Sequence, residues 1–162
     1  LDLAVRYSNK RAAFGKRVKK FQAVNFLVAD SITQLDAARG LTYMAARAVD
    51  ENYPNMRRIV SEAKRFSTEA AWNVVNNAMQ IMGGIGYTEV YPIERALRDT
   101  RLALIWTGTS QIMNLMIQHE YYDEILNQPY DRRHMEKDAM SPDESERCFT
   151  DEDMWKVHDG KV

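Results

Sequence analysis

The sequence is poor in the residues that interrupt helices or cross-link a chain. Only seven of its 162 residues are glycine and four are proline, and both types break a helix when they stand in its interior. A single cysteine, Cys148, cannot form a disulfide within the chain, which favours a reducing compartment. These scarcities predict long helices in a domain that is stabilised by packing.

Strong net charge and long apolar runs are also absent. The formal net charge is −1, so bulk electrostatics gives no case for nucleic acid or an anionic membrane as partner. No apolar run approaches the length of a membrane span. The chain begins without methionine, and its first residues resemble neither a signal nor a transit peptide but the middle of a helix. We therefore expect a fragment of a longer soluble protein.

Apolar residues recur at helical spacing along most of residues 1–126. A first amphipathic helix is expected to stop at Phe14-Gly15. Two long helices follow, the first broken at Asn52-Tyr53-Pro54 and the second ended by Gly83-Gly84. Their apolar stripes consist of Val24, Leu27, Val28, Leu35, Ala38, Ala45 and Val49, and then of Ile59, Ala63, Phe66, Ala70, Val74, Ala78 and Ile81.

Two shorter helices complete this pattern. Tyr91-Pro92 opens one, and the turn at residues 107–110 provides cap residues for the last, which continues from Ile112. No segment alternates convincingly between apolar and polar residues, so no strand is expected. The prediction is an all-α fold, an antiparallel four-helix bundle formed by residues 1–126.

Residues 127–162 differ from the rest because they are strongly charged and poor in aliphatic side chains. One interpretation is a solvated polar C-terminal extension. The alternative is an ordered segment that packs on a neighbour through Met154, Trp155 and Val157.

General patterns of metal-binding, cofactor-binding and charged sites give little in this sequence. The three histidines are far apart in sequence and no cysteine cluster exists, so no metal site is predicted. The glycines at residues 83–86 follow a helix and not a strand, which excludes a dinucleotide fingerprint, although such backbone can approach a ligand closely. The arginines of residues 94–101 have a simple explanation as a solvated helix face. The residues alone thus indicate a soluble helical bundle with two features that could contact a ligand. These are the glycine-rich connection at residues 83–86 and the cap at residues 107–110.

Four segments in the same order resemble motifs of the acyl-CoA dehydrogenase family. The first is Arg11-Ala-Ala-Phe14-Gly15-Lys16 with Gln22 at the start of the next helix, and the second is Gln80-Ile-Met-Gly83-Gly84-Ile-Gly86-Tyr87. The others are Tyr91-Pro-Ile-Glu94-Arg95-Ala-Leu-Arg98-Asp99 and Ile105-Trp106-Thr107-Gly108-Thr109-Ser110-Gln111-Ile112. Each motif alone is weak, but four in order are specific.

The resemblance implies the C-terminal helical domain of a larger flavoenzyme of acid or lipid metabolism. A helical domain and a β-domain would precede it, so we expect the present chain to be inactive by itself. The resemblance further implies FAD as cofactor, an acyl-CoA substrate, electron-transfer flavoprotein as electron acceptor, and a homotetramer built as a dimer of dimers. It implies a soluble protein of the bacterial or archaeal cytoplasm or of the mitochondrial matrix.

The resemblance also assigns roles to particular residues. Arg11 would contact the FAD pyrophosphate and Phe14 would pack near the adenine end, with Gln22 in the same region. Trp106, which replaces the usual tyrosine, and Gly108 would line the thioester pocket. Ordinary packing is the alternative role for Phe14, Gln22 and Trp106. The remaining cofactor contacts would come from Gln80, Gly83 and Gly84, which would meet FAD held mainly by a neighbouring subunit, and from Thr109 and Gln111.

Thr107 departs from the family pattern. Many members have glutamate at this position as the base that removes the substrate α-proton, and a threonine hydroxyl is a very poor proton acceptor. Because some branches take the base from the helix before the arginine motif, the base is expected to lie upstream of residue 1. The leading interpretation is oxidation of an acyl-CoA to its 2,3-enoyl-CoA. A non-oxidising acyl-CoA lyase and a catalytically silent assembly subunit remain alternatives.

Overall fold

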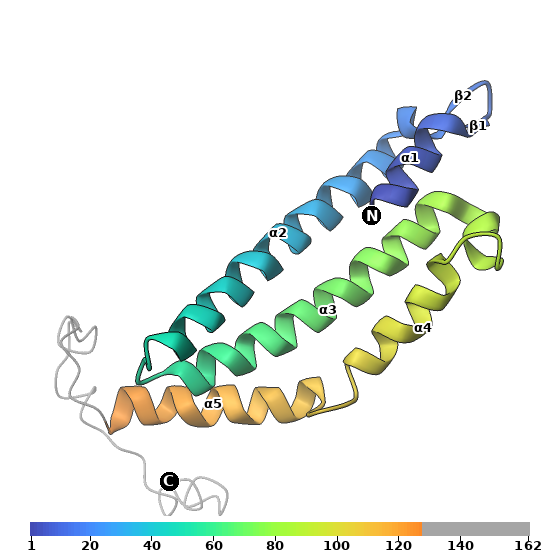
Figure 1. Cartoon of the computed structure of the whole chain (residues 1–162). Coiled ribbons are helices and arrows are strands. Elements are labelled where there is room, and N and C mark those ends of the chain that lie inside the picture. The colour runs from blue at the N-terminus through green and yellow to red at the C-terminus, as the bar shows by residue number, and fades with distance from the viewer. Residues whose placement is uncertain (128–162) are drawn as a thin grey trace, which may run out of the picture. The chain divides into compact units, whose positions relative to one another are not determined.

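The computed structural model describes residues 1–127, and these residues are almost entirely helical (Figure 1). The all-α prediction is confirmed. The prediction of a polar extension concerns residues that lie almost wholly outside the described part of the chain. The elements are α1 (Asp2–Lys10), β1 (Ala12–Ala13), β2 (Lys16–Arg17), η1 (Val18–Lys20), α2 (Gln22–Asp50), α3 (Met56–Met82), η2 (Gly83–Tyr87), α4 (Ile93–Ala103) and α5 (Ser110–Leu126).

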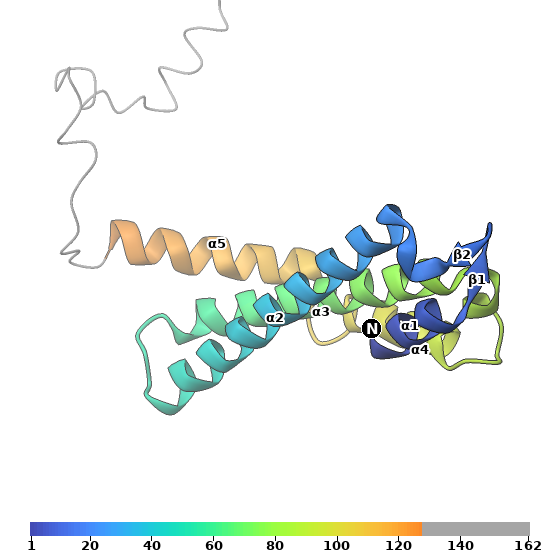
Figure 2. The same ribbon diagram turned by 90° about the horizontal axis from the view of Figure 1, so that it is seen from above.

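Helix α3 is the scaffold on which the other helices pack. It contacts α1, α2, α4 and α5, and both views show α2 lying along it (Figures 1 and 2). The first half of α3 packs against α5, whereas its second half packs against α1 and α4. The position of every other helix is therefore fixed relative to α3.

Two small cores explain this packing. Near the turn between α2 and α3, buried alanines let the helix backbones approach closely. At the other end of α3, residues from α1, α3 and α4 form a second core. The first core consists of Ala45, Ala48, Ile59 and Ala63, and the second consists of Ala4, Ala78, Ile81, Met82 and Ile93.

The beginning of the chain corrects two predictions. Helix α1 ends at Lys10, before the expected stop at Phe14-Gly15, because Arg11 has extended backbone angles. Strands β1 and β2 then pair as an antiparallel hairpin, although no strand was expected. Phe14 (φ 51°) and Gly15 (φ 76°) form its two-residue turn, and positive φ at both positions matches the right-handed twist of a hairpin.

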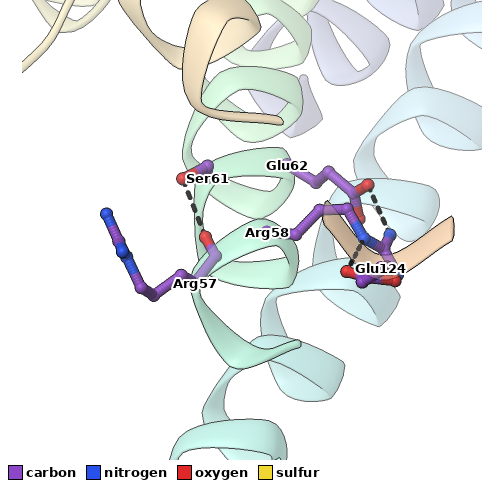
Figure 3. Close-up of polar contacts among 5 residues, drawn as sticks. All are labelled: Arg57, Arg58, Ser61, Glu62 and Glu124. Carbon is purple, nitrogen blue, oxygen red and sulfur yellow. Dashed lines mark hydrogen bonds and ion pairs between the residues drawn. The ribbon is translucent and has the colours of Figure 1, made fainter. Parts of the chain in front are cut away.

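Helix α5 is tied to α3 by an ion-pair cluster near the start of α3 (Figure 3). The Arg58 guanidinium donates to both carboxylate oxygens of Glu124, over 2.6 and 3.0 Å, and to Glu62 over 2.8 Å. These hydrogen bonds, first of all those to Glu124, raise the pKa of Arg58 above its ordinary value. Arg57 forms a second bridge to Glu120 at 3.1 Å. Charge and not apolar burial therefore fixes the end of α5, since no residue of α5 is fully buried.

Many large apolar side chains remain exposed on the outer faces of the helices. They include Phe26, Tyr43 and Met44 on α2 and Leu115, Tyr122 and Leu126 on α5. These exposed side chains make the outer faces of α2 and α5 candidates for contact with other protein surfaces. Among the described residues, no helix is both long enough and apolar enough to cross a membrane.

Candidate functional site

The first group of candidate residues surrounds the hairpin. Arg11 is exposed, and its backbone pairs with Tyr7 and Val18, so the guanidinium is free to meet a ligand while its backbone is fixed. Phe14 is 95% exposed at a positive φ, a conformation that bulky side chains rarely adopt. Strain combined with near-complete exposure indicates a side chain held out to contact something else.

The electrostatics around this hairpin suits an anion. Residues 6–20 contain no acidic residue, and Gln22, the predicted first residue of the long helix, is exposed at the start of α2. A diphosphate is stabilised by several guanidinium and ammonium groups at once. The basic residues of this segment are Arg6, Lys10, Arg11, Lys16, Arg17, Lys19 and Lys20.

The second group lies at the C-terminal end of α3. Gln80, Gly83 and Gly84 are all exposed, and Gly83 has φ 66°. A Cβ atom placed on Gly83 or Gly84 would meet nothing within 4 Å. Their backbone is therefore open to a ligand from outside.

Gly86 serves a different purpose. A Cβ atom there would lie 3.0 Å from the Cβ of Met82 and 3.1 Å from the carbonyl oxygen of Met79, so this glycine is required for packing of η2 against α3. The sequence pattern could not separate this structural glycine from the two that face outward.

The third group forms the turn between α4 and α5. Thr107 (φ 48°) and Gly108 (φ 97°) both have positive φ, and Trp106 is 56% exposed. The predicted cap is confirmed, since the Thr109 hydroxyl accepts a hydrogen bond from the Ile112 backbone N–H at 3.2 Å. Gln111 is exposed in the first turn of α5.

Within residues 1–127, the structure brings the first two groups to one end of the helical unit and leaves the third apart. Both views place the hairpin and η2 at the same end, and the turn before α5 lies partway along α3 (Figures 1 and 2). Lys64, which contacts this turn, precedes Gln80 by sixteen residues, or about 24 Å of helix. One small ligand cannot reach both places.

Lys64 is the contact to this site that sequence reasoning missed. Its ammonium donates to the carbonyl oxygen of Gly108 and, over 3.3 Å, to that of Ala103. No sequence signal marks it, because the partners are 39 and 44 residues away. Within residues 1–127, no group of three or more His, Cys, Asp or Glu side chains is arranged to hold a metal ion.

Comparisons with known proteins agree with the residue patterns. The family model described as "Acyl-CoA dehydrogenase, C-terminal domain" matches residues 1–122. The "Caffeyl-CoA reductase-Etf complex subunit CarC" of Acetobacterium woodii is 42% identical over 117 residues, which are 72% of this chain and 31% of that protein. The mitochondrial "Short-chain specific acyl-CoA dehydrogenase" of Bos taurus is also 42% identical over 117 residues, 72% of this chain and 28% of that protein.

Solved structures give the same result. The butyryl-CoA dehydrogenase of Megasphaera elsdenii superposes with a TM-score of 0.69 and 38% sequence identity, over 73% of this chain and 30% of that one. The chain thus spans less than a third of the length of these three relatives.

Proposed function

Because the chain belongs to the acyl-CoA dehydrogenase family and matches its C-terminal domain, we propose that it works within an FAD-dependent acyl-CoA dehydrogenase. The reaction is oxidation of an acyl-CoA to its 2,3-enoyl-CoA. The exposed and strained Phe14, beside Arg11 and the open glycine backbone at the end of α3, is the structural observation that best supports a cofactor surface here.

The residues of the chain fit FAD in three places. Arg11 offers a charged fork to the pyrophosphate, and Phe14 offers a flat ring to the adenine end, with Gln22 beside them. Gln80, Gly83 and Gly84 receive the FAD held mainly by a neighbouring subunit, and Thr109 and Gln111 contact it from the cap of α5. The separation of these groups along α3 fits a long cofactor shared between subunits. Bound FAD supplies the acceptor for the hydride that leaves the substrate β-carbon.

The turn before α5 contributes position and polarity to the substrate. Trp106 and Gly108 line the thioester pocket in this proposal, and the backbone N–H groups at the start of α5 polarise a nearby oxygen. Thr107 has a hydroxyl and no carboxylate, so it does not remove the α-proton. The base comes from protein outside this chain, which accounts for the inactivity that we expect of the chain alone.

Assembly completes this proposal. Exposed apolar side chains on α2 and α5 support association with other subunits, and family membership is the ground for proposing a homotetramer arranged as a dimer of dimers. One relative is named as a subunit of an Etf complex, which supports electron-transfer flavoprotein as the electron acceptor. We place the protein in the cytoplasm of a bacterium or archaeon, or in the mitochondrial matrix.

Thr107→Ala in the full-length flavoenzyme tests the assignment of the base. The rate of flavin reduction by the best acyl-CoA substrate and the rate of α-proton exchange should both stay close to those of the wild type. A positioned base contributes about 10²–10⁴-fold, so a loss of about a hundredfold in both rates with FAD still bound would assign proton transfer to Thr107.

The missing carboxylate at residue 107 also favours a second candidate, a lyase that acts on an acyl-CoA without oxidising it. Anaerobic mixing with acyl-CoAs separates the two functions. Bleaching of the flavin absorbance with formation of an enoyl-CoA supports the dehydrogenase, whereas cleavage of the substrate with the flavin still oxidised supports the lyase. A full-length protein that binds no FAD at all would be a silent assembly subunit.

A further inference from the structure

Lys64 bridges the two ends of the turn that carries Trp106 and Thr107. Its ammonium bonds to the carbonyl oxygens of Ala103 and Gly108. Ala103 is the last residue of α4, and Gly108 directly precedes Thr109, the N-cap of α5. One partly buried cation on the scaffold helix therefore holds the end of one helix beside the start of the next.

The turn needs such a restraint because its backbone is strained. Thr107 is β-branched and has φ 48°, and Gly108 follows with φ 97°. Non-glycine residues avoid this region for steric reasons, and such conformations persist only where the surroundings hold them. The Thr109 cap holds the turn from the side of α5, whereas Lys64 holds it from α3.

The same contact has an electronic consequence. The carbonyl of Gly108 and the N–H of Thr109 belong to one peptide unit. A cation that bonds to this carbonyl polarises the whole unit, because hydrogen bonds in a chain strengthen one another. The Thr109 N–H, at the positive end of α5, thereby becomes a stronger donor.

We propose that Lys64 is a positioning residue, which clamps the α4–α5 turn so that Trp106, Thr107 and the Thr109 N–H face the reacting thioester and flavin. The orientation of these groups toward thioester and flavin rests on the proposed function. The restraint of the turn by Lys64 rests only on its two carbonyl contacts, so either claim can fail while the other holds.

The test uses the full-length flavoenzyme with Lys64→Met, which keeps the length of the side chain and removes its donors. Hydrogen–deuterium exchange of the peptide that covers residues 103–112 reports the order of the turn without reference to activity. Exchange there should accelerate about tenfold or more, the effect of losing a charge-assisted hydrogen bond. The limiting rate of flavin reduction should fall by a similar factor, while FAD content and the KM for the acyl-CoA change less.

Two further variants make the result specific. Arg65→Met removes the same charge from the next residue of α3, where Arg65 pairs with Glu69 within the helix at 3.4 Å, and should leave exchange at residues 103–112 unchanged. Lys64→Arg retains charge and donors and should recover part of both losses. If Lys64→Met does not fold, Lys64→Arg takes its place in the test. Because its bulkier guanidinium fits the two carbonyls less well, the turn should then exchange faster than in the wild type.

Unchanged exchange at residues 103–112 in folded Lys64→Met would overturn the clamp. Faster exchange with an unchanged rate of flavin reduction would overturn the positioning role. If the wild-type enzyme oxidises no acyl-CoA, the proposed function fails, and the exchange measurement still decides for or against the clamp.

Discussion

Replacing Arg58 with methionine should loosen the end of α5 from α3. Arg58 makes three charge-assisted hydrogen bonds, two to Glu124 and one to Glu62 (Figure 3). The side chain of Arg58 is 18% exposed and that of Glu124 is 13% exposed, so water screens the pair only partly. Methionine would fill much of the space but leave two carboxylates facing each other without their cation.

The expected cost follows from this burial. Breaking a fully buried ion pair costs about 3–5 kcal/mol, and the partial exposure here reduces the estimate to roughly 2–3 kcal/mol. With an unfolding entropy of about 2.1 cal/mol/K per residue, 1 kcal/mol corresponds to about 4 °C for a domain of this size. Arg58→Met should therefore lower the midpoint of thermal unfolding by roughly 8–12 °C.

Glu124→Gln should cost less than Arg58→Met, because Arg58 keeps Glu62 and the amide oxygen still accepts one bond. The raised pKa of Arg58 gives the sign of the pH dependence. Its contribution is complete below the ordinary arginine pKa and is lost only above it. The loss of stability in Arg58→Met should therefore be unaffected by arginine titration near neutral pH, where Arg58 stays charged.

Thermal unfolding followed by circular dichroism at fixed protein concentration measures these differences. Arg39→Met is the matched control, since the Arg39–Asp36 pair has a similar 2.7 Å contact but side chains that are 59% and 63% exposed. Exposed pairs of this kind contribute little. The reasoning is refuted if Arg58→Met shifts the midpoint no more than Arg39→Met, or if Glu124→Gln proves the more damaging of the two cluster variants.

Two glycines and one arginine give further tests. Gly108→Ala should destabilise the protein by about 1–3 kcal/mol, because φ is 97°, a conformation that alanine avoids. The new Cβ would also lie 2.6 Å from Cε of Met113, the flexible end of a side chain that can move aside. Gly40→Ala, within α2 with nothing within 4 Å, should stabilise it by about 0.5–1 kcal/mol, and equal midpoints for both variants would contradict the argument. Arg11→Ala in the full-length enzyme should weaken FAD retention by about 1.5–3 kcal/mol, measured as flavin released on dilution, whereas Lys10→Ala should release less.

The local pattern of the sequence was sufficient for most helices. Apolar periodicity predicted α2 and α3, and their boundaries at Gln22 and Gly83 follow from the motif and from a glycine that ends a helix. The same holds for the cap at Thr109, whose hydroxyl bonds three residues ahead. Such features depend on neighbours within one helical turn, so they can be predicted from the local sequence. The roles of the FAD residues stay predictions.

The hairpin could not be predicted in this way. Its strands are two residues long, too short for any alternation to be visible, and its turn places Phe14 at a positive φ that its residue type disfavours. The pairing of Ala13 with Lys16 leaves a two-residue loop, and this hairpin geometry sets the positive φ of Phe14. The ring of Phe14 meets the edge of Phe21, with 6.3 Å between the centroids, and otherwise stays exposed.

The sequence by itself thus determined most of the helices, the cap at Thr109 and the family, because these depend on local periodicity and on motifs that are contiguous in the chain. Only the tertiary structure decided which glycines face outward, that Lys64 holds the turn before α5, and that Arg58 anchors its end. The physical reason is distance along the chain: the partners of these two side chains lie 39, 44 and 66 residues away. No local preference encodes a contact that exists only after α3 has aligned with its neighbours.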